Sequence, residues 1–182
     1  NVTMSNVTVT TVTLTNNGTL TVSSALSVTG TLTNGSTGTL NIGGTAGITT
    51  LTATAAGNIV NYNGAAQTVK ATTYSNLTLS GSGTKTFSAN TVISNLMVVS
   101  SGVKVNLNGI TTHTTGVLTL GGTGPLSSSW GATGSGAVNT TNTYFTGSGR
   151  ITINGTAPGS AIDSNYASYS NAIGDLGATV GE

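Results

Sequence analysis

The chain has 182 residues, of which 7 are charged, 27 are glycine and none is cysteine. Thr, Ser, Asn and Gly together supply 106 residues, and charged residues make up 4% where a typical soluble domain has about 25%. The composition therefore excludes nucleic-acid binding by counterion release, recruitment to acidic lipids, a disulfide framework and any thiolate chemistry.

The hydrophobic content nevertheless predicts an ordered chain, because disordered chains combine few aliphatic residues with high net charge. Here 36% of the residues are hydrophobic and the formal net charge is +1. No run reaches the roughly 20 apolar residues of a membrane helix, so we expect no membrane span. The first residue is Asn1, and we expect either a removed signal peptide or an excerpt of a longer chain. The composition is typical of extracellular and cell-surface proteins.

Residues 1–15 form the first strand-like segment. It contains no charge, proline or glycine, and its apolar residues include Val7, Val9, Val12 and Leu14. Natural proteins protect a bare strand edge with charge, proline or a covering element. We therefore expect an N-terminal strand that covers an edge or is donated to a neighbouring copy, with these four residues at the assembly interface. In the alternative, preceding coils of a longer chain cover the same edge.

In residues 16–157, apolar residues recur in short segments at every second position, often with threonine between them. This is the period-2 pattern of strands with one buried face. Turn dipeptides such as Asn34-Gly35 and Asn63-Gly64 separate the pairs. Two interleaved apolar series recur at short and nearly constant intervals: Leu20, Leu40, Val60, Leu79, Val98, Leu118, Val138; and Leu14, Leu32, Leu51, Val69, Phe87, Val105.

This short period predicts an all-β chain folded as a parallel β-solenoid with coils of about 18–20 residues. About seven or eight coils fit into the segment, and their inward Val, Leu and Ile form one continuous apolar column. The alternative is an antiparallel β-sandwich or jelly roll, in which strands recur every 8–12 residues or so.

Residues 158–182 break the pattern. Ile162, Tyr166, Tyr169, Ile173 and Leu176 fall at helical spacing, which predicts a C-terminal cap or contact segment. We add Tyr166 and Tyr169 to the expected assembly interface.

Residues 61–109 read NYNGAAQTVKATTYSNLTLSGSGTKTFSANTVISNLMVVSSGVKVNLNG. This text resembles the repeats of filamentous-haemagglutinin-like and autotransporter-type bacterial surface proteins, and of giant secreted β-helix repeat proteins of Bacteroidetes. Residues 16–60 are similar more loosely, so the resemblance covers roughly residues 12–123, and the segment from Trp130 onward departs from it. It implies a right-handed parallel β-solenoid on the cell surface that serves adhesion or scaffolding, and it brings no catalytic residues.

Acid–base catalysis needs two titratable groups held close together. The three acids, Asp163, Asp175 and Glu182, all follow residue 162, and no Asp or Glu lies in residues 12–155. His113 stands alone and is predicted at a strand surface. We expect no catalytic site, cofactor or metal, and hence no enzyme. A polysaccharide-acting module is the alternative, and it requires these groups and Arg150 to converge.

The sequence therefore predicts a structural subunit or repeat module of an extracellular filament, stalk or adhesin that self-assembles head to tail. Its partners are other copies of itself, with host or environmental surfaces or glycans as further partners. A glycan-binding module is the alternative, and it would present Trp130, Tyr144 and Phe145 as an exposed aromatic platform. Otherwise we expect these three side chains to pack beneath the C-terminal cap.

Ice binding through threonine pairs is a third hypothesis. Thr13-Leu-Thr15, Thr31-Leu-Thr33 and Thr52-Ala-Thr54 have the required form, whereas later segments read Thr78-Leu-Ser80 and Asn106-Leu-Asn108. Because the pairs do not recur at a fixed place in the apparent repeat, the sequence disfavours ice binding.

Overall fold

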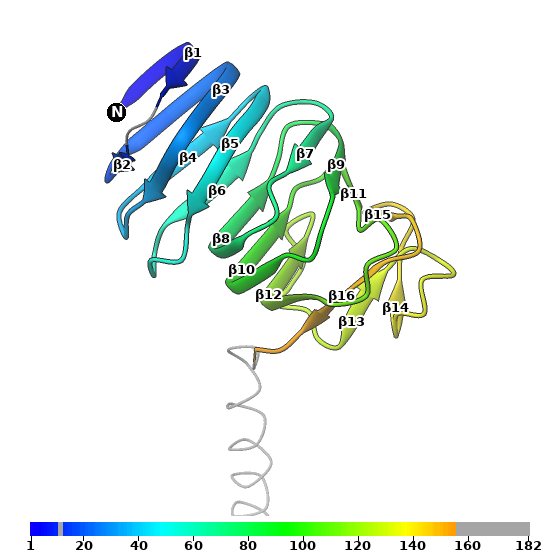
Figure 1. The fold of residues 1–182 in the computed structure, drawn as a ribbon. Coiled ribbons are helices and arrows are strands. Elements are labelled where there is room, and N and C mark those ends of the chain that lie inside the picture. Colours follow the sequence, from blue (N-terminus) through cyan, green and yellow to red (C-terminus); the bar gives the residue numbers. More distant parts are fainter. Residues whose placement is uncertain (11–12, 156–182) are drawn as a thin grey trace, which may run out of the picture.

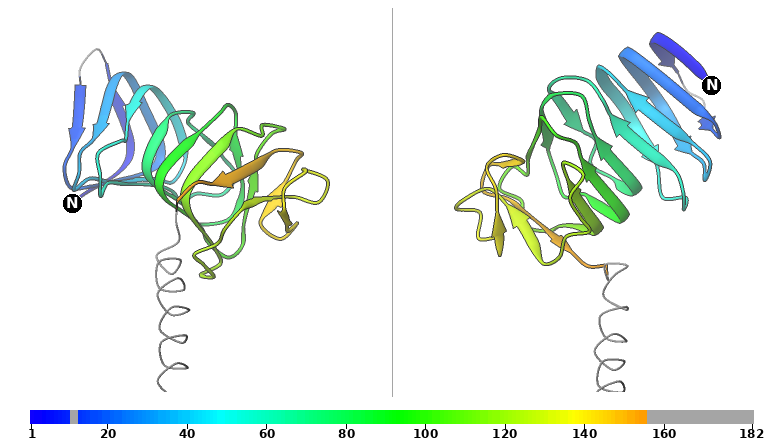
Figure 2. Two further views of the ribbon diagram at one scale, coloured as in Figure 1. Left: turned by 90° about the horizontal axis from the view of Figure 1, so that it is seen from below. Right: turned by 180° about the vertical axis from the view of Figure 1, so that it is seen from behind.

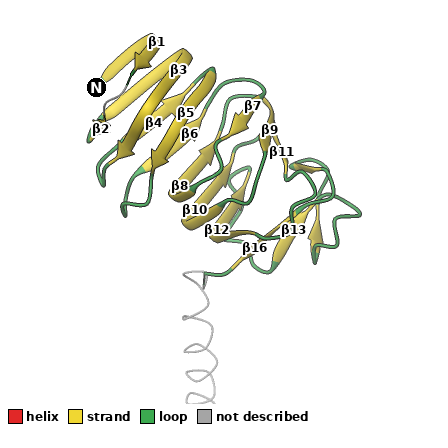
Figure 3. Ribbon diagram, viewed as in Figure 1, coloured by secondary structure: helices red, strands yellow, loops and turns green. Residues whose placement is uncertain are grey.

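The structure is a computed structural model that describes residues 1–10 and 13–155 (Figure 1). The described part is all-β, has no helix, and forms a parallel β-solenoid of about six turns (Figure 3). The predicted solenoid is thus confirmed. The antiparallel sandwich is wrong, because every ladder between described strands is parallel except that of β13 with β16. No described residue belongs to a helix that could cross a membrane.

The described strands form two sheets. The coils of the solenoid lie side by side (Figure 2). The larger sheet follows the order β1-β3-β4-β6-β8-β10-β12-β16-β13-β14, with β2 and β5 paired to β3, and the smaller follows β15-β11-β9-β7. The strands are β1 (Val2–Val9), β2 (Thr13–Asn16), β3 (Thr19–Asn34), β4 (Thr39–Ile42), β5 (Thr45–Thr52), β6 (Ile59–Tyr62), β7 (Gln67–Val69), β8 (Thr73–Leu79), β9 (Gly83–Phe87), β10 (Val92–Val99), β11 (Val103–Asn106), β12 (His113–Leu120), β13 (Ser129–Gly131), β14 (Asn139–Thr140), β15 (Phe145–Thr146) and β16 (Arg150–Ile153).

The core is built by inward side chains that stack coil upon coil. Alternate residues of a strand point to opposite faces, so one apolar residue in each coil lands on its counterpart in the next. One such column is buried throughout and consists of Leu20, Leu40, Val60, Leu77, Met97 and Leu118.

The coils differ in length, so spacing in the sequence follows this column only in part. The step from Val60 to Leu77 is shorter than the step from Leu40 to Val60, and the step from Met97 to Leu118 is longer. The series predicted from spacing therefore slips after Val60. It takes Val98, whose side chain faces outward, in place of Met97, and it ends on Val138, which is 75% exposed.

The count of seven or eight coils was too high because the chain leaves the coil path after β12. Leu120 N–H donates to Thr123 O at 2.9 Å and Leu126 N–H donates to Leu118 O at 3.0 Å, so this segment folds back over the last coil. β13 then runs antiparallel to β16. Among the described residues, this segment thus covers the core at the C-terminal end, and β14, which pairs with β13 alone, is left as the outermost strand there.

The first coil begins earlier than the predicted boundary at residue 16. β1 lies parallel to β3, with Val2 opposite Leu20 and Val9 opposite Val28. Residues 1–15 were predicted as an edge-covering or donated strand, and their described strands, β1 and the start of β2, pair with β3 of the same chain as part of the first coil.

Buried asparagines connect successive coils at one corner. Asn16 Nδ2 donates to Asn34 Oδ1 at 2.8 Å, and Asn34 Nδ2 donates to Gly38 O at 3.1 Å and Ile59 O at 3.0 Å. A Cβ on Gly38 would lie 2.4 Å from Asn34 Oδ1, so only glycine fits beside this ladder. Because the amides are buried, each lost bond leaves a polar group unsatisfied.

We predict that Asn34→Ala lowers the free energy of unfolding by about 1–3 kcal/mol, since it removes the buried bonds to the Gly38 and Ile59 carbonyls and one of the two acceptors of the Asn16 amide. Urea denaturation followed by circular dichroism measures the change. Asn95→Ala is the matched control, because the exposed Asn95 amide donates to Asn76 Oδ1 at the surface. Equal destabilisation by both variants would contradict the prediction.

Candidate functional site

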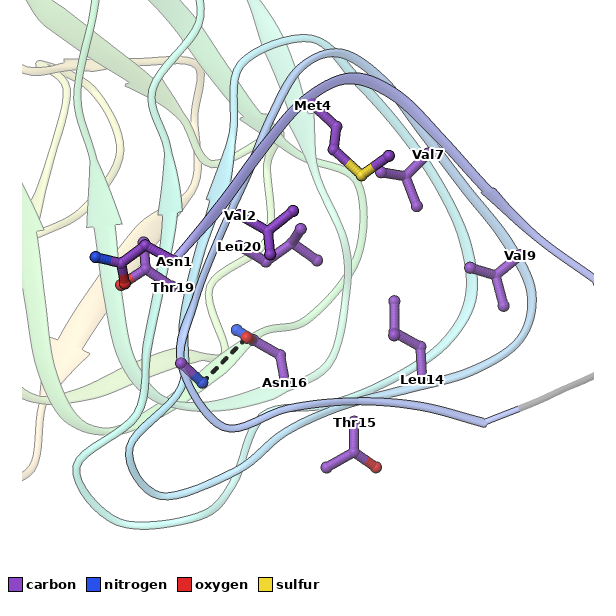
Figure 4. Close-up of a pocket in the computed structure, with 11 residues that line it drawn as sticks. Asn1, Val2, Met4, Val7, Val9, Leu14, Thr15, Asn16, Thr19 and Leu20 are labelled. Atoms are coloured by element: carbon purple, nitrogen blue, oxygen red, sulfur yellow. Dashed lines mark hydrogen bonds between the residues drawn. The ribbon is translucent and has the colours of Figure 1, made fainter.

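The N-terminal end of the solenoid is open in the described part of the chain. β1 pairs with β3 on one side, and no described strand pairs with its other edge. A cavity of about 360 Å³ opens there into the core (Figure 4). Its apolar lining comes from β1, β2 and the start of β3 and consists of Val2, Met4, Val7, Val9, Leu14 and Leu20.

Apolar side chains of this first coil are more exposed than their counterparts in the next coil. Val2 and Met4 are 53% and 46% exposed, whereas the residues they stack on, Leu20 and Val22, are 9% and 1% exposed. This difference in exposed fraction is the burial that a covering coil gives to the strand beneath it. Exposed contiguous apolar surface of this kind marks an interaction site.

The edge of β1 combines this apolar surface with unprotected backbone. A strand edge offers N–H and C=O groups for pairing with another strand. Residues 1–10 carry no charged side chain and no proline or glycine that would block such pairing. At the corner of the opening, Asn16 Oδ1 accepts from Gly18 N–H at 3.3 Å, the bond drawn in Figure 4. The site can therefore pair with and bury a strand.

The structure brings together three of the residues predicted for the assembly interface. Val7, Val9 and Leu14 are half-buried and line the same cavity. Val12, Tyr166 and Tyr169 lie outside the described residues, as does the whole predicted segment 158–182 with its helix.

Val2 and Met4 were not predicted from the sequence, although they are the most exposed apolar residues of the opening. The alternation Val2-Thr-Met4 carried the signal, because it extends the period-2 pattern of Val7 and Val9 toward the N-terminus.

The three aromatic residues predicted as a glycan platform do not form one. Phe145 is 1% exposed and pairs with Val105 in the ladder between β11 and β15, so it belongs to the core. Trp130 and Tyr144 are half-buried and pack against that core. Trp130 Nε1 donates to Ser127 O at 3.0 Å. Packing at the C-terminal end, the other expectation for these residues, describes their positions better.

His113 is buried, which corrects its predicted place at a strand surface. Thr91 N–H donates to its Nδ1 at 3.2 Å, Nε2 lies 3.3 Å from Leu107 O, and the ring meets Phe87 edge-on at 5.3 Å. The Nδ1 acceptor role leaves the ring proton on Nε2. Burial lowers the pKa of His113, so the neutral ring fits this place.

The groups that a polysaccharide-acting enzyme would need are not gathered in the described residues. His113 is in the core, and Arg150 Nη1 donates to Gly136 O at 3.3 Å near the C-terminal end. The three acids lie outside the described residues. Residues 1–10 and 13–155 contain no group of three or more His, Cys, Asp or Glu that could hold a metal ion.

Lys85 is the unexpected titratable group of the interior. Its side chain is fully buried, and Nζ donates to Gly64 O at 2.7 Å, Ala65 O at 2.6 Å and Gln67 Oε1 at 2.9 Å. Burial lowers the pKa of Lys85 to about 8. Strand alternation carried a signal for this position, because Lys85 shares the inward face of β9 with Phe87.

No protein-family model, curated protein or solved structure matches the chain. The function is therefore inferred from the residues and their geometry.

We predict that the wild-type protein gains stability between pH 8 and 10.5 relative to Lys85→Met. In this window the unfolded lysine still holds a proton that the folded one has lost, so the free energy of unfolding rises with pH, by up to about 3 kcal/mol. Urea denaturation of both proteins across this range measures the difference. Tyr62 and Tyr74 titrate in both proteins and cancel in the comparison. Parallel pH profiles would contradict the prediction.

Proposed function

We propose that this chain is a structural module of an extracellular filament, stalk or adhesin whose copies associate through the open N-terminal end. The observation that carries the proposal is the first coil, whose outer edge no described strand covers and in which Val2 and Met4 are about half exposed over an apolar cavity. A further β-coil is the partner that fits, because it supplies both a strand edge and inward apolar side chains.

The contact that we propose is head to tail. The larger sheet begins with β1 and ends with β14, so these two strands are its outermost strands. A contact between the β1 end of one copy and the far end of the next uses two different surfaces. Such a contact repeats without closing and builds a fibre.

The extracellular setting rests on composition. The chain is rich in Thr, Ser and Asn, and it has 7 charged residues in 182 and no cysteine. Its stability therefore relies little on ion pairs and not at all on disulfides. Coil-on-coil burial supplies that stability instead. The resemblance of residues 61–109 to bacterial surface repeats supports the same setting, with adhesion or scaffolding as the role.

We predict that Val7→Lys/Val9→Lys abolishes association of the chain. Both side chains line the opening, and a covering coil would have to bury two ammonium groups without partners, which costs several kcal/mol. Sedimentation over a range of concentrations and electron microscopy measure the effect. Circular dichroism establishes that the variant keeps its β-structure.

Thr8→Lys is the matched control. Thr8 lies between the two valines, is exposed, and points to the opposite side of β1, so this variant should assemble as the wild type does. A wild-type chain that stays monomeric at high concentration would overturn the proposal. A closed particle of two copies would replace the head-to-tail contact with a two-fold one.

A further inference from the structure

Threonines on one outer face of the solenoid are aligned from coil to coil. Strand β2 pairs with the end of β3, which in turn pairs with the end of β5. These registers place three Thr-Leu-Thr motifs on top of one another, with their leucines turned inward. The motifs are Thr13-Leu14-Thr15, Thr31-Leu32-Thr33 and Thr50-Leu51-Thr52.

The second threonine of this motif continues into a column along the solenoid. Thr52 precedes Ala53, which bridges to Tyr74, so Thr73 is the next residue in the column. Thr73 then pairs with Val92, Val92 with Thr114, and Thr114 with Thr152. The column holds six threonines and one valine, which has nearly the same shape: Thr15, Thr33, Thr52, Thr73, Val92, Thr114 and Thr152.

The sequence disfavoured ice binding because threonine pairs do not recur at a fixed interval, but strand register aligns several of them nonetheless. The steps along the column are unequal in length, so no fixed period connects its members. The longest step, from Thr114 to Thr152, spans the segment that leaves the coil path after β12. The threonine pairs at residues 13/15, 31/33 and 50/52 share one position in the structure, and single residues continue the column in the later coils, although Thr78 lies elsewhere and pairs with Asn61 and Val98.

The hydroxyl groups of these threonines are turned to solvent. No side-chain hydrogen bond joins any of them to another described residue, and all are exposed or half-exposed. A second polar column, on the outer side of β3, β4 and β6, behaves differently. There Asn41 Nδ2 donates to Thr21 Oγ1 and Asn61 Nδ2 donates to Asn41 Oδ1, both at 3.1 Å. One column is bonded within the protein, and the threonine column is left for a ligand.

The array carries methyl and hydroxyl groups but no charge. Two cations close in sequence or pairing to the array donate to backbone carbonyls: Lys70 Nζ to Thr49 O at 3.1 Å and Arg150 Nη1 to Gly136 O at 3.3 Å. The two threonine columns contain no aromatic side chain on which a sugar ring could stack. The ligand that matches them is itself uncharged, extended and hydrogen-bonding.

We infer that this threonine face binds ice. Coils repeat at about 4.8 Å and residues two apart in a strand at about 6.6 Å, so the hydroxyls form a two-dimensional grid over the three stacked motifs and a single row beyond them. Such a grid can hold water oxygens at the regular spacings of a crystal surface, while the methyl groups exclude disordered water. This activity uses the side of the solenoid and is independent of assembly through its N-terminal end.

Thermal hysteresis, ice-crystal shaping and adsorption of the labelled chain to an ice surface test the inference. We expect the wild-type chain to show all three and Thr33→Lys/Thr52→Lys to lose them, because ammonium groups in the middle of the array disrupt the grid. Thr39→Lys/Thr78→Lys is the matched control. It adds the same charges on the outer side of β4 and β8, and it should retain ice binding. Thermal melting followed by circular dichroism establishes that both variants fold.

Three results would overturn the inference. The first is a folded wild-type chain with neither hysteresis nor ice adsorption. The second is an equal loss of activity in both double variants. The third is adsorption to crystalline cellulose, and not to ice, that depends on Thr33 and Thr52. Measuring in the Val7→Lys/Val9→Lys background separates ice binding from association, since that background disables the proposed assembly contact only.

Discussion

Every feature of this protein depends on the burial of one coil by the next. An inward aliphatic side chain such as Leu40 is fully buried because a coil lies on each side of it, and Val2 is half exposed because a described coil lies on only one side of it. With 7 charged residues and no cysteine, the chain can add few ion pairs and no disulfide to this burial and to the hydrogen bonds of the strand ladders. The same dependence makes the first coil a natural place for contact with another β-coil.

Several polar side chains of the interior bond to backbone carbonyls. Gln67 Nε2 donates to Ile42 O and Gly44 O, both at 2.8 Å, and its Oε1 accepts from Lys85. This cluster lies where β5 and β7 belong to different sheets and form no ladder. Gln67 thus supplies across this break the hydrogen bonds that strand pairing supplies elsewhere, and Lys85 holds Gln67 from β9. The buried amides of Asn16 and Asn34 do the same at a corner.

The proposed roles divide between the end and the side of the solenoid. The end is apolar and incomplete, which suits burial against another coil. The side presents in-register hydroxyls to which no other described side chain is hydrogen-bonded. A parallel solenoid supports both because its strand pairing fixes which side chains recur at the same position, whatever the spacing between them in the chain.

Local alternation and mean spacing were enough to predict the strands, the approximate coil length and the apolar character of the first coil. Val7, Val9 and Leu14 could be assigned to the apolar lining of the first coil on that basis. The register could not be predicted in this way, since coils of unequal length place Met97, and not Val98, inside. Register also buried His113, Lys85 and Phe145 and aligned the threonine column. Strand pairing is a long-range contact between coils, and no local pattern in the chain fixes it.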